Sequence, residues 1–197
     1  MSKLDELKRH LKPGQAYRRA DLARWSASVD RHLRELVKSG TLRKLSGGLY
    51  VYPKETEFGP APPADKEVVA AFLKEKSFLL ASPNAYNSLG VGTTQLYDRT
   101  VVYNHKRHGD FQLGKRKFAF RMKHRFPKAL TREFLLVDLV NNVDQLAEAK
   151  DELLKRVAEH AAKSDPKQLR RMVREYGNER AKKFFDCALA ARELHAT

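Results

Sequence analysis

A proline-rich stretch is the feature that most constrains how this chain can fold. Residues 53–63 hold four prolines in eleven positions and show no apolar periodicity. Proline fixes φ and removes a backbone donor, so this stretch is unsuited to a helix interior or a central strand. We therefore expect a semi-rigid linker over 53–63, which separates an N-terminal domain over 1–52 from a second domain over 64–197.

Three short helical patterns and a hairpin pattern occupy the N-terminal domain. The first helix is expected to end before Pro13, the second to cover about 20–24, and the third to run from an N-cap at Ser26 or Ser28 to Lys38. Two β-prone runs then flank a Gly-Gly turn, which predicts a hairpin. Three helices followed by a hairpin is the order of a winged helix-turn-helix.

The third predicted helix has an apolar face and a basic face. Its expected apolar stripe is Val29, Leu33, Leu36 and Val37, and its expected outward residues are Ser28, Arg31, Arg34, Glu35 and Lys38. Arginine can bond the O6 and N7 edges of guanine in the major groove, whereas Ser28 and Lys38 are better suited to phosphate. The predicted phosphate contacts of the wing and of the segment before the second helix are Arg18, Arg19, Arg43 and Lys44. The alternatives are that such a face is a solvated surface or a protein contact.

The positive charge is concentrated in two regions of the sequence. The chain has a net charge of +15, of which residues 1–50 carry +7 and residues 97–132 carry +9. Residues 51–96 carry −1, and residues 133–197 are neutral. Two separate basic regions favour a polyanionic partner such as nucleic acid, or an acidic protein.

The second basic region includes a predicted strand over 117–125. Phe118, Phe120 and Met122 are expected on one face and Lys117, Arg121, Lys123 and Arg125 on the other. With the preceding turn they form a predicted auxiliary basic surface, made up of Lys115, Arg116, Lys117, Arg121, Lys123 and Arg125. This surface could bind nucleic acid, dock an acidic protein, or protect an edge strand from aggregation.

The rest of the second domain reads as short strands followed by helices. Ser82 is expected to cap a short helix, Asp165 to open a later one and Asn178 to cap the last. Cys187 is expected to be a small buried apolar residue. The predicted fold class is therefore α+β, an N-terminal winged helix-turn-helix followed by a mixed domain of short antiparallel strands and C-terminal helices.

The sequence offers little that would support catalysis. It has one cysteine and no phosphate loop, and His105 and His108 flank Lys106-Arg107, where positive neighbours oppose a metal. We expect no enzyme, no metal and no cofactor. No apolar run is long enough to span a bilayer, and we expect a cytoplasmic protein.

Two blocks of the sequence resemble a known family. Residues 39–54 read Ser-Gly-x-Leu-x-x-Leu-x-x-Gly-Leu-Tyr-x-x-Pro-Lys, and residues 82–90 read Ser-Pro-Asn-Ala-Tyr-Asn-Ser-Leu-Gly, followed by Thr93-Thr94-Gln95. In this order they resemble the AbiEi-like antitoxins of type IV toxin–antitoxin systems, over roughly residues 3–125. The resemblance implies an N-terminal winged helix and a repressor that binds inverted repeats in double-stranded DNA of its own promoter. It also implies an antagonist of a nucleotidyltransferase-like toxin, with the C-terminal domain needed for antitoxicity.

Taken together, these features predict a sequence-specific DNA-binding repressor that regulates its own operon as the antitoxin of such a pair. The alternative is a protein-interaction module whose basic surfaces dock an acidic partner and bind nucleic acid only non-specifically.

Overall fold

The chain folds into two compact units in this computed structural model, which describes residues 3–195. The N-terminal unit comprises the residues up to Ser77 together with Asp110–Phe118, and the C-terminal unit comprises Phe78–Gly109 and the residues from Ala119 onward. Both units mix helices with short antiparallel strands, so the fold class is α+β. The chain therefore divides after Ser77, some distance beyond the predicted linker.

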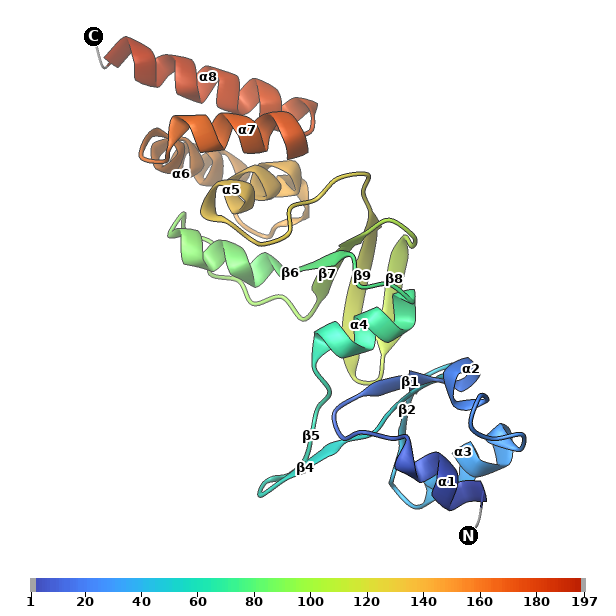
Figure 1. Ribbon diagram of the computed structural model, residues 1–197. Coiled ribbons are helices and arrows are strands. Elements are labelled where there is room, and N and C mark those ends of the chain that lie inside the picture. Colours follow the sequence, from blue (N-terminus) through green and yellow to red (C-terminus); the bar gives the residue numbers. More distant parts are fainter. Residues whose placement is uncertain (1–2, 196–197) are drawn as a thin grey trace. The chain divides into compact units, whose positions relative to one another are not determined.

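The N-terminal unit begins with a helix, a strand, two further helices and two strands (Figure 1). These are α1 (Lys3–Arg9), β1 (Ala16–Arg18), α2 (Arg19–Leu22), α3 (Val29–Lys38), β2 (Arg43–Ser46) and β3 (Leu49–Val51). The strands form an antiparallel sheet of order β1-β3-β2. The Gly47-Gly48 turn joins β2 to β3 as predicted. Gly48 has a φ of +69°, a backbone conformation in which a residue with a side chain would be strained.

One apolar core joins these helices to the sheet. Leu7, Leu22 and Leu36 are each fully buried in it, as the helical spacing predicts. Trp25, which is half-buried, stacks on His10 with ring centroids 4.5 Å apart. Helix α2 ends at Leu22, two residues earlier than expected, so six residues separate it from α3.

The predicted linker forms regular structure instead. Strands β4 (Lys54–Thr56) and β5 (Gly59–Ala61) pair as an antiparallel hairpin, in which Pro60 lies opposite Glu55. A two-stranded hairpin tolerates Pro60 because its strands have free edges, where a missing amide donor costs little. Helix α4 (Asp65–Leu73) follows and packs against β1 and β3, which is why the N-terminal unit continues past the prolines.

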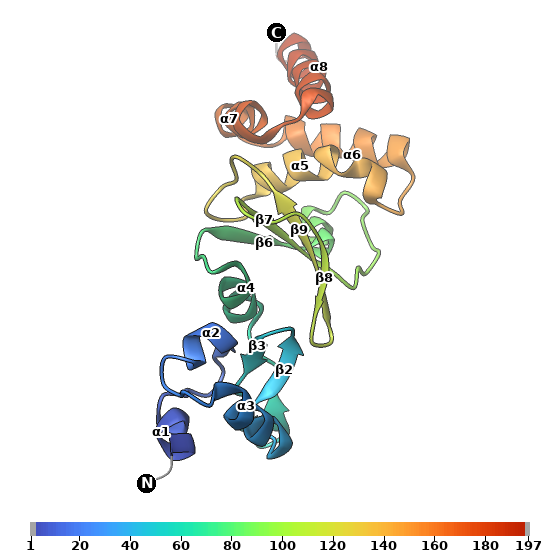
Figure 2. The ribbon, with the colours of Figure 1, turned by 90° about the vertical axis from the view of Figure 1, so that its right-hand side faces the viewer.

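The C-terminal unit combines strands with a group of helices (Figure 2). A sheet of order β6-β7-β9-β8 contains β6 (Phe78–Ala81), β7 (Thr100–Asn104), β8 (Gly109–Leu113) and β9 (Arg116–Met122), of which Asp110–Phe118 group with the N-terminal unit. Its helices are η1 (Pro83–Leu89), α5 (Arg132–Asn141), η2 (Val143–Gln145), α6 (Lys150–Ala162), α7 (Pro166–Tyr176) and α8 (Glu179–His195). The three caps predicted in this unit are confirmed, because the side chains of Ser82, Asp165 and Asn178 each accept a bond from a backbone amide of the helix that follows.

A buried carboxylate lies in the middle of the C-terminal core. Asp138 of α5 accepts hydrogen bonds from the hydroxyls of Tyr86 at 2.7 Å and Tyr103 at 2.6 Å, and Asn142 donates to it at 3.2 Å. Burial raises the pKa of Asp138 above its ordinary value, although these donors partly offset the effect. The network links η1, β7 and α5 through polar groups that satisfy one another.

Cys187 is exposed on α8, so the prediction that it is buried was wrong. The inward residues of this helix are Ala181, Phe185 and Leu189.

Within residues 3–195, no helix is both long and apolar enough to cross a membrane.

Candidate nucleic-acid interface

Helix α3 separates its buried and exposed side chains cleanly. Val29, Leu33 and Leu36 are buried as predicted, and Ser28, Arg31, Arg34 and Lys38 are exposed. Val37 was expected in the apolar stripe but is 38% exposed. His32 takes its place, 3% exposed, with Nδ1 2.7 Å from the hydroxyl of buried Ser26. The hydrogen bond to Ser26 satisfies a polar ring in the core, which a pattern of apolar residues does not show.

The start of α3 differs from the expected side-chain cap. Ser28 occupies the N-cap position, but its side chain makes no capping hydrogen bond, and Ser26 is used by His32. The Ser28 hydroxyl is therefore exposed beside the first turn of α3, where phosphate contacts are favoured.

Arg19 and Asp30 connect the start of α2 to the first turn of α3. Nε and Nη2 of Arg19 lie 2.6 Å and 2.5 Å from the two carboxylate oxygens of Asp30. The hydrogen bond from Arg19 holds the pKa of Asp30 below its ordinary value. Arg19, a predicted phosphate contact, thus has a partner within the protein.

The two predicted base-reading arginines remain accessible on α3. Arg31 lies 3.8 Å from the Glu35 carboxylate in an exposed pair, and Arg34 Nε donates to the backbone carbonyl of Asp30 at 3.3 Å. An exposed ion pair of this kind contributes little to folding stability, so Arg31 can readily exchange Glu35 for another anion. Lys38 lies one turn further along the same face.

Strand register separates the other predicted phosphate contacts. Arg18 lies opposite Leu49, and Arg43 opposite Val51, so both start on the sheet face that carries these buried residues. Lys44 lies opposite Tyr50, on the other face. One guanidinium nitrogen of Arg18, Nη1, is buried without a hydrogen-bond partner within residues 3–195. Of Arg18, Arg43 and Lys44, only Lys44 starts on the sheet face that carries Tyr17 and Tyr50. These two tyrosines pack in the α1–α3 core.

The predicted auxiliary basic surface is split between the two units. Lys115, Arg116 and Lys117 belong to the N-terminal unit, where Arg116 forms an ion pair with Asp65. Arg121, Lys123 and Arg125 belong to the C-terminal unit. The ammonium of Lys123 lies 5.7 Å from the centre of the Tyr103 ring, and Arg121 donates to the carbonyl of Phe120.

The strand itself is shorter than predicted. Strand β9 ends at Met122, so Lys123 and Arg125 follow it rather than extending its ladder. Met122, expected on the buried face, is 55% exposed, whereas Ala119, on the face expected to be open, is 2% exposed. Both faces of β9 are therefore covered at its centre, and the idea of one open basic face was wrong.

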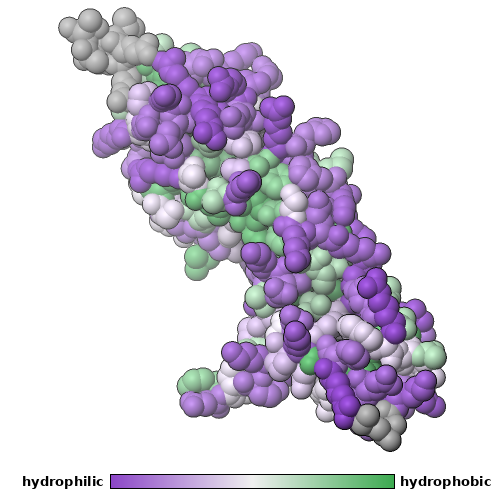
Figure 3. Space-filling view, in the orientation of Figure 1, coloured by the Kyte–Doolittle hydropathy of each residue, from purple (hydrophilic) through white to green (hydrophobic). Residues whose placement is uncertain are grey.

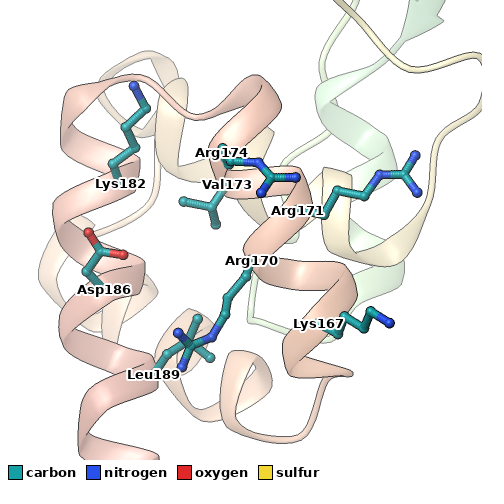
Figure 4. Close-up of a pocket in the computed structure, with 8 residues that line it drawn as sticks. All are labelled: Lys167, Arg170, Arg171, Val173, Arg174, Lys182, Asp186 and Leu189. Carbon is teal, nitrogen blue, oxygen red and sulfur yellow. The ribbon is translucent and has the colours of Figure 1, made fainter.

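A further basic surface, missed in the sequence, lies on α7 and α8. Lys167, Arg170, Arg171 and Arg174 follow one face of α7 at helical spacing and, with Lys182 of α8, line a hollow of about 650 Å³. The surface over α7 is hydrophilic in Figure 3, and Figure 4 shows Val173 pointing between the helices while Lys167 and Arg171 point away from α8. The i, i+3, i+4, i+7 spacing was readable, but the neutral total of residues 133–197 concealed it.

The chemistry of these surfaces is that of anion binding. Within residues 3–195, no three His, Cys, Asp or Glu side chains are grouped so that they could hold a metal. The exposed guanidinium and ammonium groups of α3 and the β2–β3 hairpin can bond phosphate oxygens and base edges.

Comparison with known proteins gives a family and a structural relative. The model of a "Family of unknown function (DUF6088)" matches residues 10–172. The fold is similar to that of the RV2827C protein from Mycobacterium tuberculosis, with a TM-score of 0.59 and 17% identity over 96% of this chain and 75% of that one. At this identity, the likeness concerns the fold alone. No curated protein matches the chain.

Proposed function

The chain belongs to the DUF6088 family, whose function is unknown, and from the basic face of α3 we propose that it is a sequence-specific DNA-binding protein. The observation that carries this proposal is the exposure of Arg31, Arg34 and Lys38 along one side of a helix whose opposite side is buried. Such a helix can enter the major groove, where each base pair presents its own pattern of donors and acceptors.

The N-terminal unit acts as a winged helix-turn-helix in this proposal. Its element order, with α2 and α3 followed by the β2–β3 hairpin, supports this reading. Helix α3 reads bases, and the hairpin is the wing that contacts the sugar–phosphate backbone through Lys44. Ser28 and Lys38, near the two ends of α3, hold phosphates on either side of the groove.

The biological role we propose is repression of the protein's own promoter, as the antitoxin of a type IV toxin–antitoxin pair. This part rests on the resemblance of residues 39–54 and 82–95 to AbiEi-like antitoxins. A protein that binds inverted repeats as a pair has half-sites about 10–10.5 bp apart, or a multiple of that spacing. Footprinting of the promoter measures this spacing directly.

The deciding experiment compares DNA from upstream of the protein's own gene with a shuffled duplex of equal length. The salt concentration should be about 150 mM, because a chain of net charge +15 binds any DNA at low ionic strength. A preference of about a thousandfold or more for the upstream DNA is expected. Equal affinity for both duplexes would overturn sequence-specific binding.

A second candidate function is docking of an acidic protein, such as the toxin, on the α7–α8 surface. The observation that favours it is the set of five cations around one hollow that also contains the apolar side chains Val173 and Leu189, a composition suited to a protein partner. Co-purification of a partner that survives nuclease treatment and is lost in Arg170→Glu/Arg174→Glu would support it. The wild-type chain purifying alone would count against it.

A further inference from the structure

A cavity within the N-terminal unit lies next to the β2–β3 hairpin. It has a volume of about 250 Å³ and is formed by β2, β3, the segment after β5, α4 and the β8–β9 turn. Its apolar wall includes Val51, Val68, Leu113 and Phe118, each no more than 3% exposed. The cavity's volume is smaller than that of the usual site of a drug-sized molecule, but its wall has the same apolar character.

The charged groups around this cavity are unbalanced. Arg43, Lys44, Lys115 and Arg116 contribute to its lining, and the Arg116 guanidinium is neutralised by Asp65. Among the side chains of residues 3–191, neither Arg43 nor Lys115 has a hydrogen-bond or ion-pair partner. Two unpaired cations at the mouth of an apolar cavity favour a molecule that carries a negative charge on an apolar body.

The register of β2 distinguishes two of these cations. Arg43 pairs with Val51, which is 1% exposed and lines the cavity, so the two side chains start on the same face of the sheet. Lys44 pairs with Tyr50, which packs against the α1–α3 core on the opposite face. Arg43 can therefore reach an anion in the cavity, whereas Lys44 starts away from it.

A close backbone approach fixes the cavity's boundary. The amide of Gly114 donates to the carbonyl of Leu45 at 2.8 Å, which ties the β8–β9 turn to β2. Gly114 has a φ of +65°, and a Cβ there would lie 2.9 Å from Cδ2 of Leu45. Glycine thus lets the turn come close enough to place Lys115 at the cavity.

We propose that this cavity binds a small organic anion with an apolar body, such as an aromatic carboxylate, through Arg43 and Lys115. The apolar part lies against Val68, Leu113 and Phe118, and the anionic group bonds the two cations at the mouth. Burial of the apolar part adds to the affinity. An inorganic anion has no apolar part and therefore lacks this contribution.

A molecule bound in the cavity should also change DNA binding, and this second effect rests on the proposed function. A bound anion neutralises Arg43, next to Lys44 on the hairpin, and so lowers the positive charge of the wing that we propose contacts the phosphate backbone. The anion then weakens binding to DNA of any sequence, because the phosphates meet less positive charge. Anion binding itself requires no DNA and is measured separately.

The test uses the full chain and the fluorescent anion anilinonaphthalene sulfonate as the probe. We expect saturable binding of one probe per chain, displaced by naphthalene carboxylate but not by inorganic phosphate at equal ionic strength. Arg43→Gln and Lys115→Gln should each weaken probe binding about tenfold, since each removes a charged hydrogen bond. Lys66→Gln, the matched control at an exposed cation of α4 that does not line the cavity, should change it less than about twofold.

The results that overturn the proposal are equally specific. They are the absence of saturable binding to the wild type, displacement by phosphate as effective as by naphthalene carboxylate, or equal losses in the Arg43 and Lys66 variants. Circular dichroism of every variant guards against misfolding, and Ala61→Phe, which fills the cavity from β5, gives an independent loss of probe binding. If the probe binds as expected while upstream and shuffled DNA bind alike, the ligand site stands and the proposed function fails.

Discussion

The guanidinium of Arg19 and the carboxylate of Asp30 form a two-point contact, with Nε 2.6 Å from Oδ1 and Nη2 2.5 Å from Oδ2. Both side chains are half exposed or more. The contact places a negative charge in the first turn of α3, on the helix that we propose reads DNA. It therefore opposes phosphate there and at the same time occupies Arg19.

Asp30→Asn should consequently strengthen binding to DNA of any sequence. The change removes a charge that repels phosphate and releases Arg19 for a contact of its own, so the slope of log affinity against log salt should steepen by about 0.9. Fluorescence anisotropy titrations at several salt concentrations measure this slope. Asp151→Asn, an exposed acid in the first turn of α6, is the matched control and should leave the slope unchanged. Weaker binding by Asp30→Asn would instead mean that Arg19 contributes through the position in which Asp30 holds it.

Base reading and charge can be separated on the α3 face and the hairpin. Arg31→Ala or Arg34→Ala should cost about 1–3 kcal/mol on the cognate site and relax the preference at one base position. Lys44→Ala should weaken all sequences alike and reduce the salt dependence, because a phosphate contact carries no sequence information. Affinity measurements on cognate and shuffled duplexes give both quantities. Equal losses on both duplexes for all three variants would contradict the assignment of α3 as the reading helix.

Gly114→Ala tests the contact between the β8–β9 turn and β2. An alanine at φ +65° is strained by about 1–2 kcal/mol, and its Cβ displaces Leu45, which lines the cavity. Gly40→Ala is the control, because Gly40 has a φ of +75° and open space where an added Cβ would lie. Urea unfolding should show similar losses of stability for both variants, while affinity for anilinonaphthalene sulfonate should fall only in Gly114→Ala. Unchanged probe affinity in Gly114→Ala would show that Leu45 does not shape the cavity.

The basic face of α3 could be predicted because it depends on helical period alone. Val29, Leu33 and Leu36 set the buried side, and the outward positions of Arg31 and Arg34 follow from 3.6 residues per turn. His32 could not be predicted in the core, because its burial depends on a hydrogen bond to Ser26 that exists only once the chain folds. The pairing of Arg19 with Asp30 is tertiary for the same reason.

Other errors came from treating segments in isolation. The prolines of residues 53–63 suggested a linker, but a two-stranded hairpin needs few backbone donors and accepts Pro60. Alternation around Phe118 and Phe120 correctly predicted a strand, yet it could not show that Ala119 is covered as well. Whether a strand is buried on one face or both depends on what packs against it.

The buried carboxylate of Asp138 makes a prediction about stability and pH. Burial raises its pKa in the folded chain above the ordinary 3.8, so folding favours the protonated form. Its contribution to stability is fully present below about pH 3.8 and is lost as the pH rises through the raised folded value. Asp138→Asn removes this dependence. The difference in unfolding free energy between wild type and variant should therefore fall with rising pH, by at most about 1.4 kcal/mol per pH unit.

Asp144 provides a control of opposite sign for the same measurement. Hydrogen bonds from Lys150 and Arg180 lower its pKa below 3.8, so its contribution is present above that pH and is lost as the pH falls through the folded value. Urea unfolding of Asp138→Asn and Asp144→Asn across the acidic range should thus give differences from wild type that run in opposite directions. The same direction for both would mean that the hydroxyls of Tyr86 and Tyr103 stabilise the Asp138 carboxylate more than its burial destabilises it.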